Sequence, residues 1–280
     1  MRVRHGSGDA GTGQNTILAQ IAAHELGVHL ADVEVLSMDS EKTPFELGAW
    51  SSRGTHMTGS SVGQAAREFA ERLRALAAEK LGVAAAEVTL AGGQAVGGDE
   101  AVDLGDLVTL SGESLLSHET SYVLEGTEPL SPDKDTANLS PSYAFAAHGV
   151  TVEVDRRTGA VRVTDYVAAH DVGTAINPIA VEGQIIGGTA MGIGAALGEE
   201  LIREGGRIVN DTYLHYALPR NADLPSIRAV IVNGNDKNGP YGAKSVGEMS
   251  IIPPGAAIAN AVSDAIGVRI RELPITPDKG

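Results

Sequence analysis

The spacing of hydrophobic residues along the chain predicts several helices. In residues 16–26 and 60–81, apolar side chains recur every three or four positions. Each run ends at a glycine, Gly27 or Gly82, as is common at helix C-termini. Further helices are predicted at 104–110, from Asn177-Pro178 to about residue 196, and at Gly255–Ile266.

Alternation of apolar and polar residues predicts strands between these helices. The clearest pair is 144–154 and 161–169, which the turn Asp155-Arg-Arg-Thr-Gly159 joins into a hairpin. Because helices and strands alternate irregularly, the expected fold class is α+β, or mixed α/β. Shorter strands are predicted from Val3, at 32–37, 88–90, 95–96 and 121–124, near 207–216, and at 227–232.

The chain is expected to form one domain, residues 1–280, made of two α+β subdomains at about 1–142 and 143–280. The polar, proline-containing segment 131–142 is the best candidate for a mobile loop. Because a strand begins as early as Val3, we expect the chain to be one piece of a larger fold.

Composition narrows the class of protein. Glycine accounts for 35 of 280 residues and falls in clusters, so we expect several loops to approach a ligand. The net charge of −15 disfavours binding to nucleic acid or to an anionic membrane surface. The absence of cysteine excludes a disulfide, a thiolate metal site and an iron–sulfur cluster on this chain. Without a signal peptide or a long apolar run, a cytoplasmic protein is expected.

Three motifs resemble known sites and are weak when taken singly. Gly6-Ser-Gly-Asp-Ala-Gly11 matches a dinucleotide fingerprint, but Gly13 stands where the helix should begin, so a Rossmann-type NAD-binding protein is only an alternative to another anion-cradling loop. The segment Gly239–Ser245 resembles a P-loop, but an alanine separates its last glycine from the lysine. The eight histidines, among them His170, form no zinc-binding motif and are interpreted as hydrogen-bonded structural residues.

The stretch Gly239–Pro254 carries a single carboxylate, Glu248, among glycines and ahead of two prolines. Glycines let the backbone approach a ligand closely, and prolines restrict how the chain leaves the loop. From these residues alone, Glu248 is a candidate general base or a surface acid.

Four segments, in order, connect this stretch with the rest of the chain. They are Gly8-Asp-Ala-Gly-Thr-Gly-Gln-Asn-Thr16; Gly48-Ala-Trp-Ser-Ser-Arg-Gly-Thr55; His170-Asp-Val-Gly-Thr-Ala-Ile-Asn-Pro178 with Glu182-Gly-Gln-Ile-Ile-Gly-Gly188; and Gly239-Pro-Tyr-Gly-Ala-Lys-Ser-Val-Gly-Glu248 with the ending Leu273-Pro-Ile-Thr-Pro277. Together they resemble the C-terminal part of the molybdopterin-binding subunit of the xanthine dehydrogenase/aldehyde oxidase family of molybdenum hydroxylases. Within that family the chain looks most like 4-hydroxybenzoyl-CoA reductase and nicotinate dehydrogenase. The fold implied is the second molybdenum-cofactor-binding domain of these enzymes.

The resemblance implies a molybdenum–molybdopterin cofactor, in its cytosine dinucleotide form. The pterin dithiolene would hold the metal, so no side chain of this chain is expected to be a metal ligand. Glu248 would be the catalytic base, and Met249, Ile251, Ile252 and the two prolines would surround it with apolar groups. The backbone N–H groups of the first loop would approach the cofactor's phosphates. The implied cofactor-binding residues are Gly11, Thr12, Gly13, Gln14, Asn15, Thr16, Ser51, Ser52, Arg53, Gln184, Lys244, Ser245, Val246 and Gly247.

The resemblance also implies partners. The N-terminal half of the molybdopterin subunit would be a separate chain, and [2Fe–2S] clusters and FAD would lie on an iron–sulfur subunit and a FAD subunit. The implied reaction inserts a water-derived oxygen at an electron-poor carbon of an N-heteroaromatic, an aldehyde or an aromatic acyl-CoA. The main alternative is a non-catalytic half of a split complex, which binds the cofactor or serves assembly.

Overall fold

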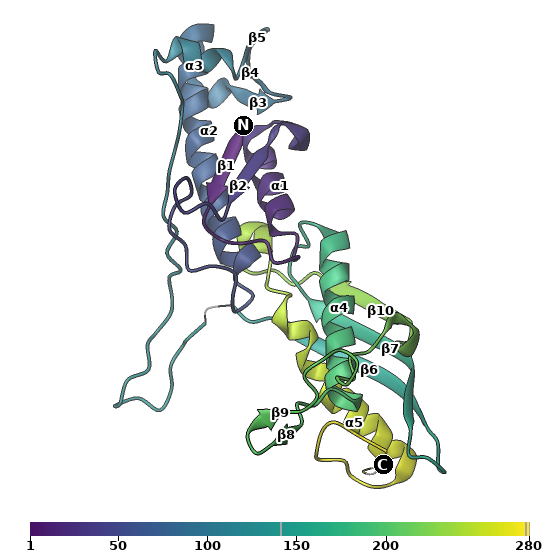
Figure 1. Ribbon diagram of the computed structural model, residues 1–280. Helices are drawn as coiled ribbons and strands as arrows, with labels where there is room; N and C mark the ends of the chain where they lie inside the picture. The colour runs from purple at the N-terminus through teal and green to yellow at the C-terminus, as the bar shows by residue number, and fades with distance from the viewer. Residues whose placement is uncertain (141, 278, 280) are drawn as a thin grey trace. The chain divides into compact units, whose positions relative to one another are not determined.

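The computed structural model describes residues 1–140, 142–277 and 279 (Figure 1). Contacts within the chain divide it into two units. Unit 1 comprises Met1–Ser142 together with Asp236–Ala243, and unit 2 comprises Tyr143–Asn235 together with Lys244–Gly280.

Unit 1 is built on two packed helices, α1 (Gln14–Leu26) and α2 (Gly59–Leu81). Both helices end where the sequence predicts, at Gly27 and Gly82, whose left-handed φ values of 61° and 67° suit a residue without a Cβ. Its remaining regular elements are β1 (Arg2–His5), β2 (Glu34–Ser37), β3 (Thr89–Ala91), β4 (Gln94–Gly97), β5 (Glu100–Asp103) and α3 (Asp106–Leu110). The pair β1 and β2 is parallel, and β3, β4 and β5 form an antiparallel sheet in that order.

The core of unit 1 lies between α2 and the small antiparallel sheet. Ala70 and Leu73 of α2 are buried against Leu90 of β3 and Leu107 of α3. These side chains recur on one face of α2, as the helical spacing predicts, and arginine and glutamate occupy much of the opposite face.

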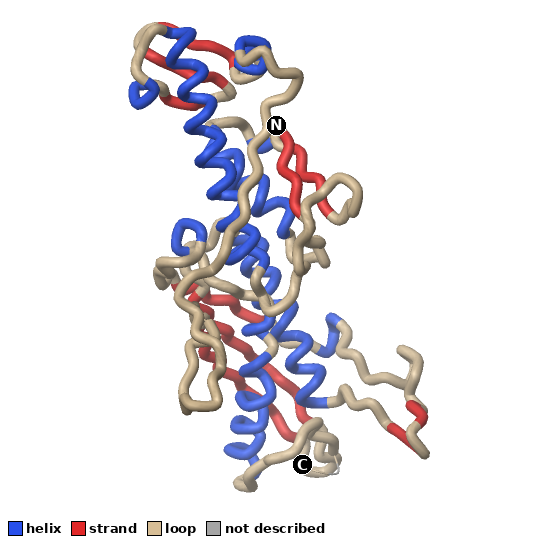
Figure 2. Tube along the Cα trace, turned by 90° about the vertical axis from the view of Figure 1, so that its left-hand side faces the viewer, coloured by secondary structure: helices blue, strands red, loops and turns tan. Residues whose placement is uncertain are grey.

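Unit 2 consists of a three-stranded sheet with two helices packed against it (Figures 1 and 2). The sheet order is β10 (Ile227–Val232), β7 (Val161–Asp171) and β6 (Phe145–Val154). As predicted, β6 and β7 form an antiparallel hairpin, whereas β10 runs parallel to β7. The helices α4 (Pro178–Leu197) and α5 (Ile252–Ile266) bury residues such as Ile185 and Ile258 against Tyr166 and Ala168 of β7.

Both helices of unit 2 start at residues suited to that position. The side chain of Asn177 accepts a hydrogen bond from the backbone N–H of Ala180 at 3.1 Å, and Pro178 follows it as the first residue of α4. Helix α5 begins at Ile252, three residues before the predicted Gly255, because its two prolines occupy the first turn, where no intrahelical N–H bond is lost.

Several predicted elements are wrong or shorter than predicted. Residues 121–124 form no strand, and between 207 and 216 only β9 (Arg207–Ile208) pairs, with β8 (Arg203–Glu204). An alternating pattern becomes a strand only if another strand pairs with it, and none does so at 121–124 in the described chain. The described residues of the predicted loop 131–142 lie in no helix or strand, and Pro141 lies outside the described residues.

Candidate functional site

The glycine loop of unit 1 is organised around its own carboxylate, Asp9. The backbone N–H groups of Gly11 and Gly13 donate to Asp9 Oδ1, and that of Asn15 donates to Asp9 Oδ2, all at 3.1 Å. Left-handed φ values of 92° at Gly11 and 76° at Gly13 turn these groups inward. The N–H groups of the loop therefore converge on a carboxylate of the same loop, and the binding of a separate anion there stays a prediction.

Next to this loop are buried polar atoms without a hydrogen-bond partner among the described residues. Gln14 is 4% exposed, and its Nε2 has no acceptor. The same holds for Ser7 Oγ and for Nδ1 of His5, whose Nε2 lies 3.0 Å from Asn15 Oδ1. Since buried polar groups are ordinarily paired, this part of unit 1 fits the binding of a polar group. Thr12 and Thr16, also predicted cofactor contacts, are exposed.

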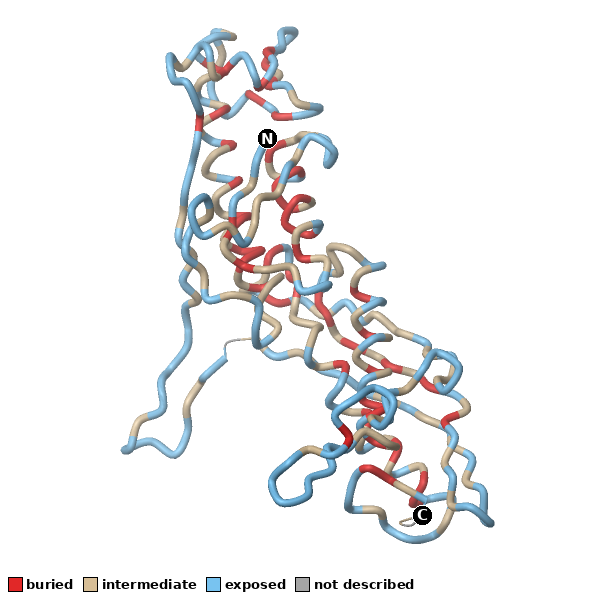
Figure 3. Tube along the Cα trace, viewed as in Figure 1, coloured by how far each residue is buried: buried red, intermediate tan, exposed pale blue. Residues whose placement is uncertain are grey.

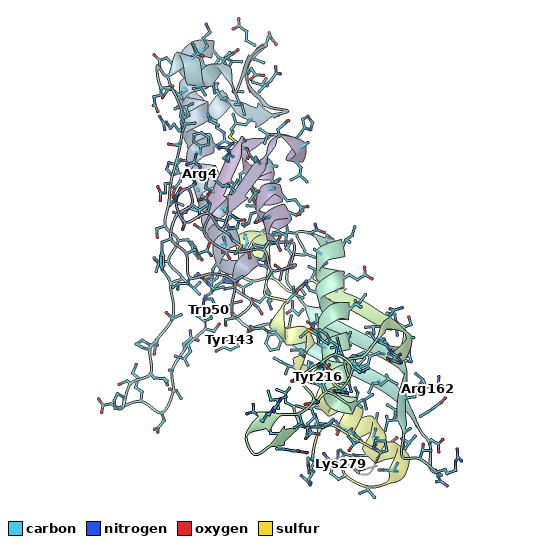
Figure 4. The ribbon with its side chains drawn as sticks, viewed as in Figure 1. Arg4, Trp50, Tyr143, Arg162, Tyr216 and Lys279 are labelled. Carbon is cyan, nitrogen blue, oxygen red and sulfur yellow. The ribbon has the colours of Figure 1, made fainter. Side chains whose placement is uncertain are left out.

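The second predicted segment of unit 1 has an unusual backbone. Ser51 and Ser52 are both left-handed, each with φ of 52°, and a π-helical turn, Gly54–Thr58, follows. Two consecutive non-glycine residues with left-handed backbone angles store conformational strain. π-helical turns often occur at functional positions. Arg53 donates from Nη1 to the carbonyl oxygen of Gly48 at 3.3 Å, and its guanidinium lies 5.9 Å from the ring centroid of Trp50 (Figure 4).

The first half of the stretch that begins at Gly239 belongs to unit 1. Asp236 Oδ1 accepts the N–H groups of Asn238 at 2.7 Å and Gly239 at 3.2 Å, and its carboxylate lies near the buried His56. Tyr241, with φ of 55°, donates its hydroxyl to Glu25 at 2.6 Å. Burial, and then this bond, raise the pKa of Tyr241. These contacts hold the turn in place without using any predicted cofactor residue.

The second half of that stretch belongs to unit 2 and begins with a partly buried ion pair. Lys244 Nζ donates to Asp171 Oδ2 at 2.7 Å and lies 5.3 Å from the ring centroid of Phe145. Asp171 Oδ1 also accepts the N–H groups of Gly173 at 3.1 Å and Gly234 at 3.0 Å. Burial acts to raise the pKa of Asp171, but the bonds from Lys244 and the backbone outweigh it and hold that pKa below its usual value. The charge of Lys244 is thus balanced within unit 2, and sequence reasoning missed its partner.

A serine connects two of the predicted site segments in unit 2. Ser250 is buried, and its Oγ donates to the carbonyl oxygens of Gly247 at 2.9 Å and Gln184 at 3.1 Å. A Cβ at Gly188 would lie 2.1 Å from the same Oγ, so this glycine permits the close approach. The structure therefore brings the 245–248 segment against α4 at Gln184, through a residue that no sequence pattern singled out.

Glu248 lies at the start of a single 3-10 turn, Glu248–Ser250, and is exposed. The expected apolar surroundings are largely missing, because Ile251 is exposed and Ile252 is 73% exposed. Met249 is only half-buried. Pro254 is buried, but Glu248 itself is exposed, so within this chain these apolar residues do not exclude water from its carboxylate. Their enclosure of Glu248 in a complete site stays a prediction.

A histidine pair, in which His170 is buried and His148 is half-buried, lies on the sheet of unit 2. His148 Nε2 and His170 Nε2 are 2.7 Å apart, and His148 Nδ1 is 2.9 Å from the hydroxyl of Tyr166. Burial, and then the neighbouring His170, lower the pKa of His148 to about 4. Burial also lowers the pKa of His170 and raises that of Tyr166. His170 is thus hydrogen-bonded through Nε2, as expected, whereas its buried Nδ1 has no partner among the described residues, and its structural role stays a prediction.

The described part of the chain holds no group of three or more histidine, aspartate or glutamate side chains placed to bind a metal ion. A half-open pocket of about 590 Å³ in unit 1 is lined by α2, residues 121–125 and residues 237–241. None of the predicted site residues lines it.

Comparisons with known proteins give a consistent result. A family model described as a molybdopterin cofactor-binding domain matches residues 1–225. The chain is 33% identical, over 284 residues, to the gamma subunit of the 6-hydroxypseudooxynicotine dehydrogenase complex of Paenarthrobacter nicotinovorans, a match that covers 99% of this chain and 35% of that subunit. It is 35% identical, over 287 residues, to a putative xanthine dehydrogenase molybdenum-binding subunit of Escherichia coli, with coverage of 100% and 37%.

Among solved structures, the crystal structure of quinoline 2-oxidoreductase from Pseudomonas putida 86 superposes with a TM-score of 0.83 at 33% identity. That match covers 98% of this chain and 35% of the other. The chain thus spans about a third of the length of the relatives it matches.

Proposed function

Because the chain belongs to the molybdopterin cofactor-binding domain family, we propose that it is the C-terminal part of the molybdenum-binding subunit of a hydroxylase. The proposed reaction inserts a water-derived oxygen at an electron-poor carbon of an N-heteroaromatic, an aldehyde or an aromatic acyl-CoA. The observation that carries the proposal is the match over 97–100% of this chain to relatives named for the oxidation of xanthine, aldehydes and 6-hydroxypseudooxynicotine.

Unit 1 carries residues that fit the cofactor. The buried Nε2 of Gln14, which has no partner among the described residues, can donate to a polar group of the pterin or its nucleotide. The exposed hydroxyls of Thr12 and Thr16 lie on the same loop, near the N-terminus of α1, where an anion is favoured. Our proposed cofactor contacts in unit 1 are Gly11, Thr12, Gly13, Gln14, Asn15, Thr16, Ser51, Ser52 and Arg53.

In unit 2 the proposed contacts are Gln184, Lys244, Ser245, Val246 and Gly247. The link from Ser250 to Gln184 and Gly247 supports this assignment, since it holds two of the segments together within one unit. When bound, a molybdenum–molybdopterin, which we propose to be the cytosine dinucleotide form, would supply the two-electron redox centre. The electrons would leave through [2Fe–2S] clusters and FAD on partner chains, since this chain has no cysteine to hold a cluster.

Glu248 is proposed as the catalytic base, which accepts a proton on its carboxylate during oxygen transfer. A base works best in surroundings that exclude water, and in this chain Glu248 is exposed. We therefore assign its enclosure to the part of the subunit that the relatives carry beyond the matched region. We propose that this part is the N-terminal half of the subunit, carried on a separate chain.

The test is Glu248→Gln in the native complex purified with its partner chains, compared with Glu204→Gln at an exposed position in β8. Turnover of quinoline, benzaldehyde or benzoyl-CoA, assayed by dye reduction, should fall about 10²- to 10⁴-fold in Glu248→Gln, as expected for loss of a general base. Molybdenum and pterin content should match wild type, and Glu204→Gln should behave as wild type. Full turnover by Glu248→Gln would reject the base, and a wild-type complex free of molybdenum and pterin would reject the proposed cofactor.

A further inference from the structure

Helix α4 is apolar around nearly its whole circumference. Of its 20 residues, Glu182 is the only one with a charged side chain, and Gln184 and Thr189 are the other polar residues. Its length and composition would allow it to cross a membrane, yet only 39% of its most apolar window is buried. A helix that is apolar on all sides normally lies inside a protein. In this chain, therefore, less of the surface of α4 is buried than is usual for a helix with so few polar residues.

One side of α4 packs on the sheet and on α5, through residues such as Val181, Ile185 and Ile193. Another side carries a row spaced four residues apart, Ile179, Gly183, Gly187 and Met191, which we call the α4 ridge. All four residues are exposed, Ile179 at 83% and Met191 at 60%. A Cβ placed on either glycine would meet no atom within 4 Å.

The α4 ridge has the shape of a helix contact surface. Residues four apart form the ridges and grooves by which helices pack. Two glycines between two large apolar residues make a shallow groove with an apolar contact at each end, where another backbone can approach closely. Burying Ile179 and Met191 against another apolar surface would remove two large side chains from water, which is favourable.

We propose that the α4 ridge binds an apolar segment of the part of the molybdenum-binding subunit that lies outside this chain. This rests on the proposed function. The length of the relatives supports this choice of occupant: matches that cover 97–100% of this chain cover only 28–37% of the curated relatives, so each relative has ample further polypeptide to cover the helix. The loop that follows α4 is drawn mostly as exposed in Figure 3. Its apolar residues Tyr213 and Leu214 are both 86% exposed and could also be covered by the further polypeptide.

The first test measures the oxidation of Met191 by hydrogen peroxide, with mass spectrometry of the peptide that contains it. The 280-residue chain alone is compared with the complete subunit, and a free methionine peptide in each sample reports the oxidant dose. In the complete subunit Met191 should oxidise about tenfold more slowly, because sulfoxide formation follows exposure. Equal rates in the two samples would overturn the proposal.

The second test introduces bulk into the groove. Gly187→Leu should leave the isolated chain at least as stable as wild type, since the position is open and leucine favours helix more than glycine does. The added leucine side chain should lower the affinity for the rest of the subunit about tenfold or more, because it overfills the groove. A tenfold loss corresponds to about 1.4 kcal/mol of binding free energy. The matched control is Ala75→Leu on an exposed position of α2 in unit 1, which should leave this affinity unchanged. Unaltered affinity in Gly187→Leu would also overturn the proposal.

Two other occupants give distinct results. Protection of Met191 in the isolated chain that rises with its concentration would identify a second copy, and protection by phosphatidylcholine–phosphatidylglycerol vesicles would identify a lipid surface. Either result would overturn the proposal. Molybdenum content is measured on the same samples. A complete subunit with protected Met191 but no molybdenum contradicts the proposed function, and one with molybdenum but unprotected Met191 contradicts only the docking surface.

Discussion

Asp9 in unit 1 and Asp171 in unit 2 each fasten a glycine-containing segment, but with different partners. Asp9 accepts three backbone N–H groups and, among the described residues, pairs with no cation. Asp171 accepts two backbone N–H groups and the ammonium of Lys244. Around the Asp9 loop, His5, Ser7 and Gln14 each keep a buried polar atom without a partner in the described chain, whereas next to Asp171 only His170 Nδ1 does so.

Because of this difference, an external anion could replace Asp9 in its loop at little cost, whereas replacing Asp171 at its junction with Lys244 would be costly. If another anion displaces Asp9, the N–H groups find a new acceptor, and water can solvate the freed carboxylate, because Asp9 is only half-buried. If Asp171 is displaced, Lys244 is left as a buried charge without its counter-ion, which is costly. The loop in unit 1 is therefore suited to a ligand, and the junction in unit 2 is suited to fixing the segment that ends at Glu248.

The largest expected effect is that of Asp171→Asn. It leaves Lys244 unpaired at 10% side-chain exposure, so unit 2 should lose about 3 kcal/mol of unfolding free energy. The measurement is native-state hydrogen exchange at the β7 amides. Adding Lys244→Met to the same variant should recover most of the loss, because both charges are then gone. If the double variant were no more stable than the single one, the ion pair would not be the source of the effect.

A second, smaller effect is acid sensitivity of unit 2. His148 is neutral in the folded state down to its lowered pKa of about 4, whereas in the unfolded chain it takes up a proton near pH 6.5. The stability that the neutral pair contributes is complete above pH 6.5 and is lost as the pH falls from there toward 4. Because His148 is partly exposed, we expect the unfolding free energy of unit 2 to fall by only about 2 kcal/mol over this pH range. Urea unfolding at a series of pH values provides the measurement. His148→Gln should flatten the profile in this range, and an equally steep profile in that variant would assign the effect to another group.

In unit 1, Asp9→Ala should cost less than Asp171→Asn. The variant deprives three N–H groups of their acceptor, but the loop is partly exposed and water can replace it, so the expected cost is about 1–2 kcal/mol. Asp9→Asn keeps one carbonyl acceptor and should lie between wild type and Asp9→Ala. Exchange rates at the α1 amides provide the measurement. A cost as large as that of Asp171→Asn would remove the distinction between the two carboxylates.

The smallest effect has the opposite sign. Gln14→Met replaces a buried amide that lacks a partner for its Nε2 with an apolar side chain of similar size. We expect unit 1 to become more stable by about 1 kcal/mol, since an unsatisfied buried donor is penalised. The same variant should reduce pterin content in the purified complex. Greater stability with unchanged pterin content would count against a role of Gln14 in cofactor binding.

Sequence periodicity predicted the elements whose stabilising contacts are local or adjacent in the chain. Helices α1 and α2 and the β6–β7 hairpin follow from spacing and from glycine at the helix ends. The parallel pairing of β10 with β7 could not be predicted, because nothing in either strand specifies a partner that lies across a long connection. No local pattern in Asp236–Ala243 indicates that this segment packs with residues 1–142.

The site shows the same limit. The residues alone made Glu248 a candidate base or surface acid, and the family resemblance favoured the base and selected Gln184. The roles assigned to both residues stay predictions. Ser250, which ties their segments together, was missed because a serine in a loop matches no pattern. Asp9 could have been found, since an aspartate two residues before a glycine is a common turn signal. The exposure of Glu248 could not have been predicted from the sequence, because burial depends on which other parts of the fold pack against the residue.

The short segment Asp236–Ala243 constrains how this protein can be recombined with its relatives. It lies far along the chain, yet its partners are in the first 142 residues: Asn238 accepts bonds from Ser60 and Tyr122, and Tyr241 bonds to Glu25. A chimera joined at residue 142 would combine the first unit of one parent with an eight-residue insert from the other. A chimera that is to fold should therefore take residues 1–142 and Asp236–Ala243 from the same parent. Residues that contact each other across these two segments should change together among relatives, although about a hundred residues separate them in sequence.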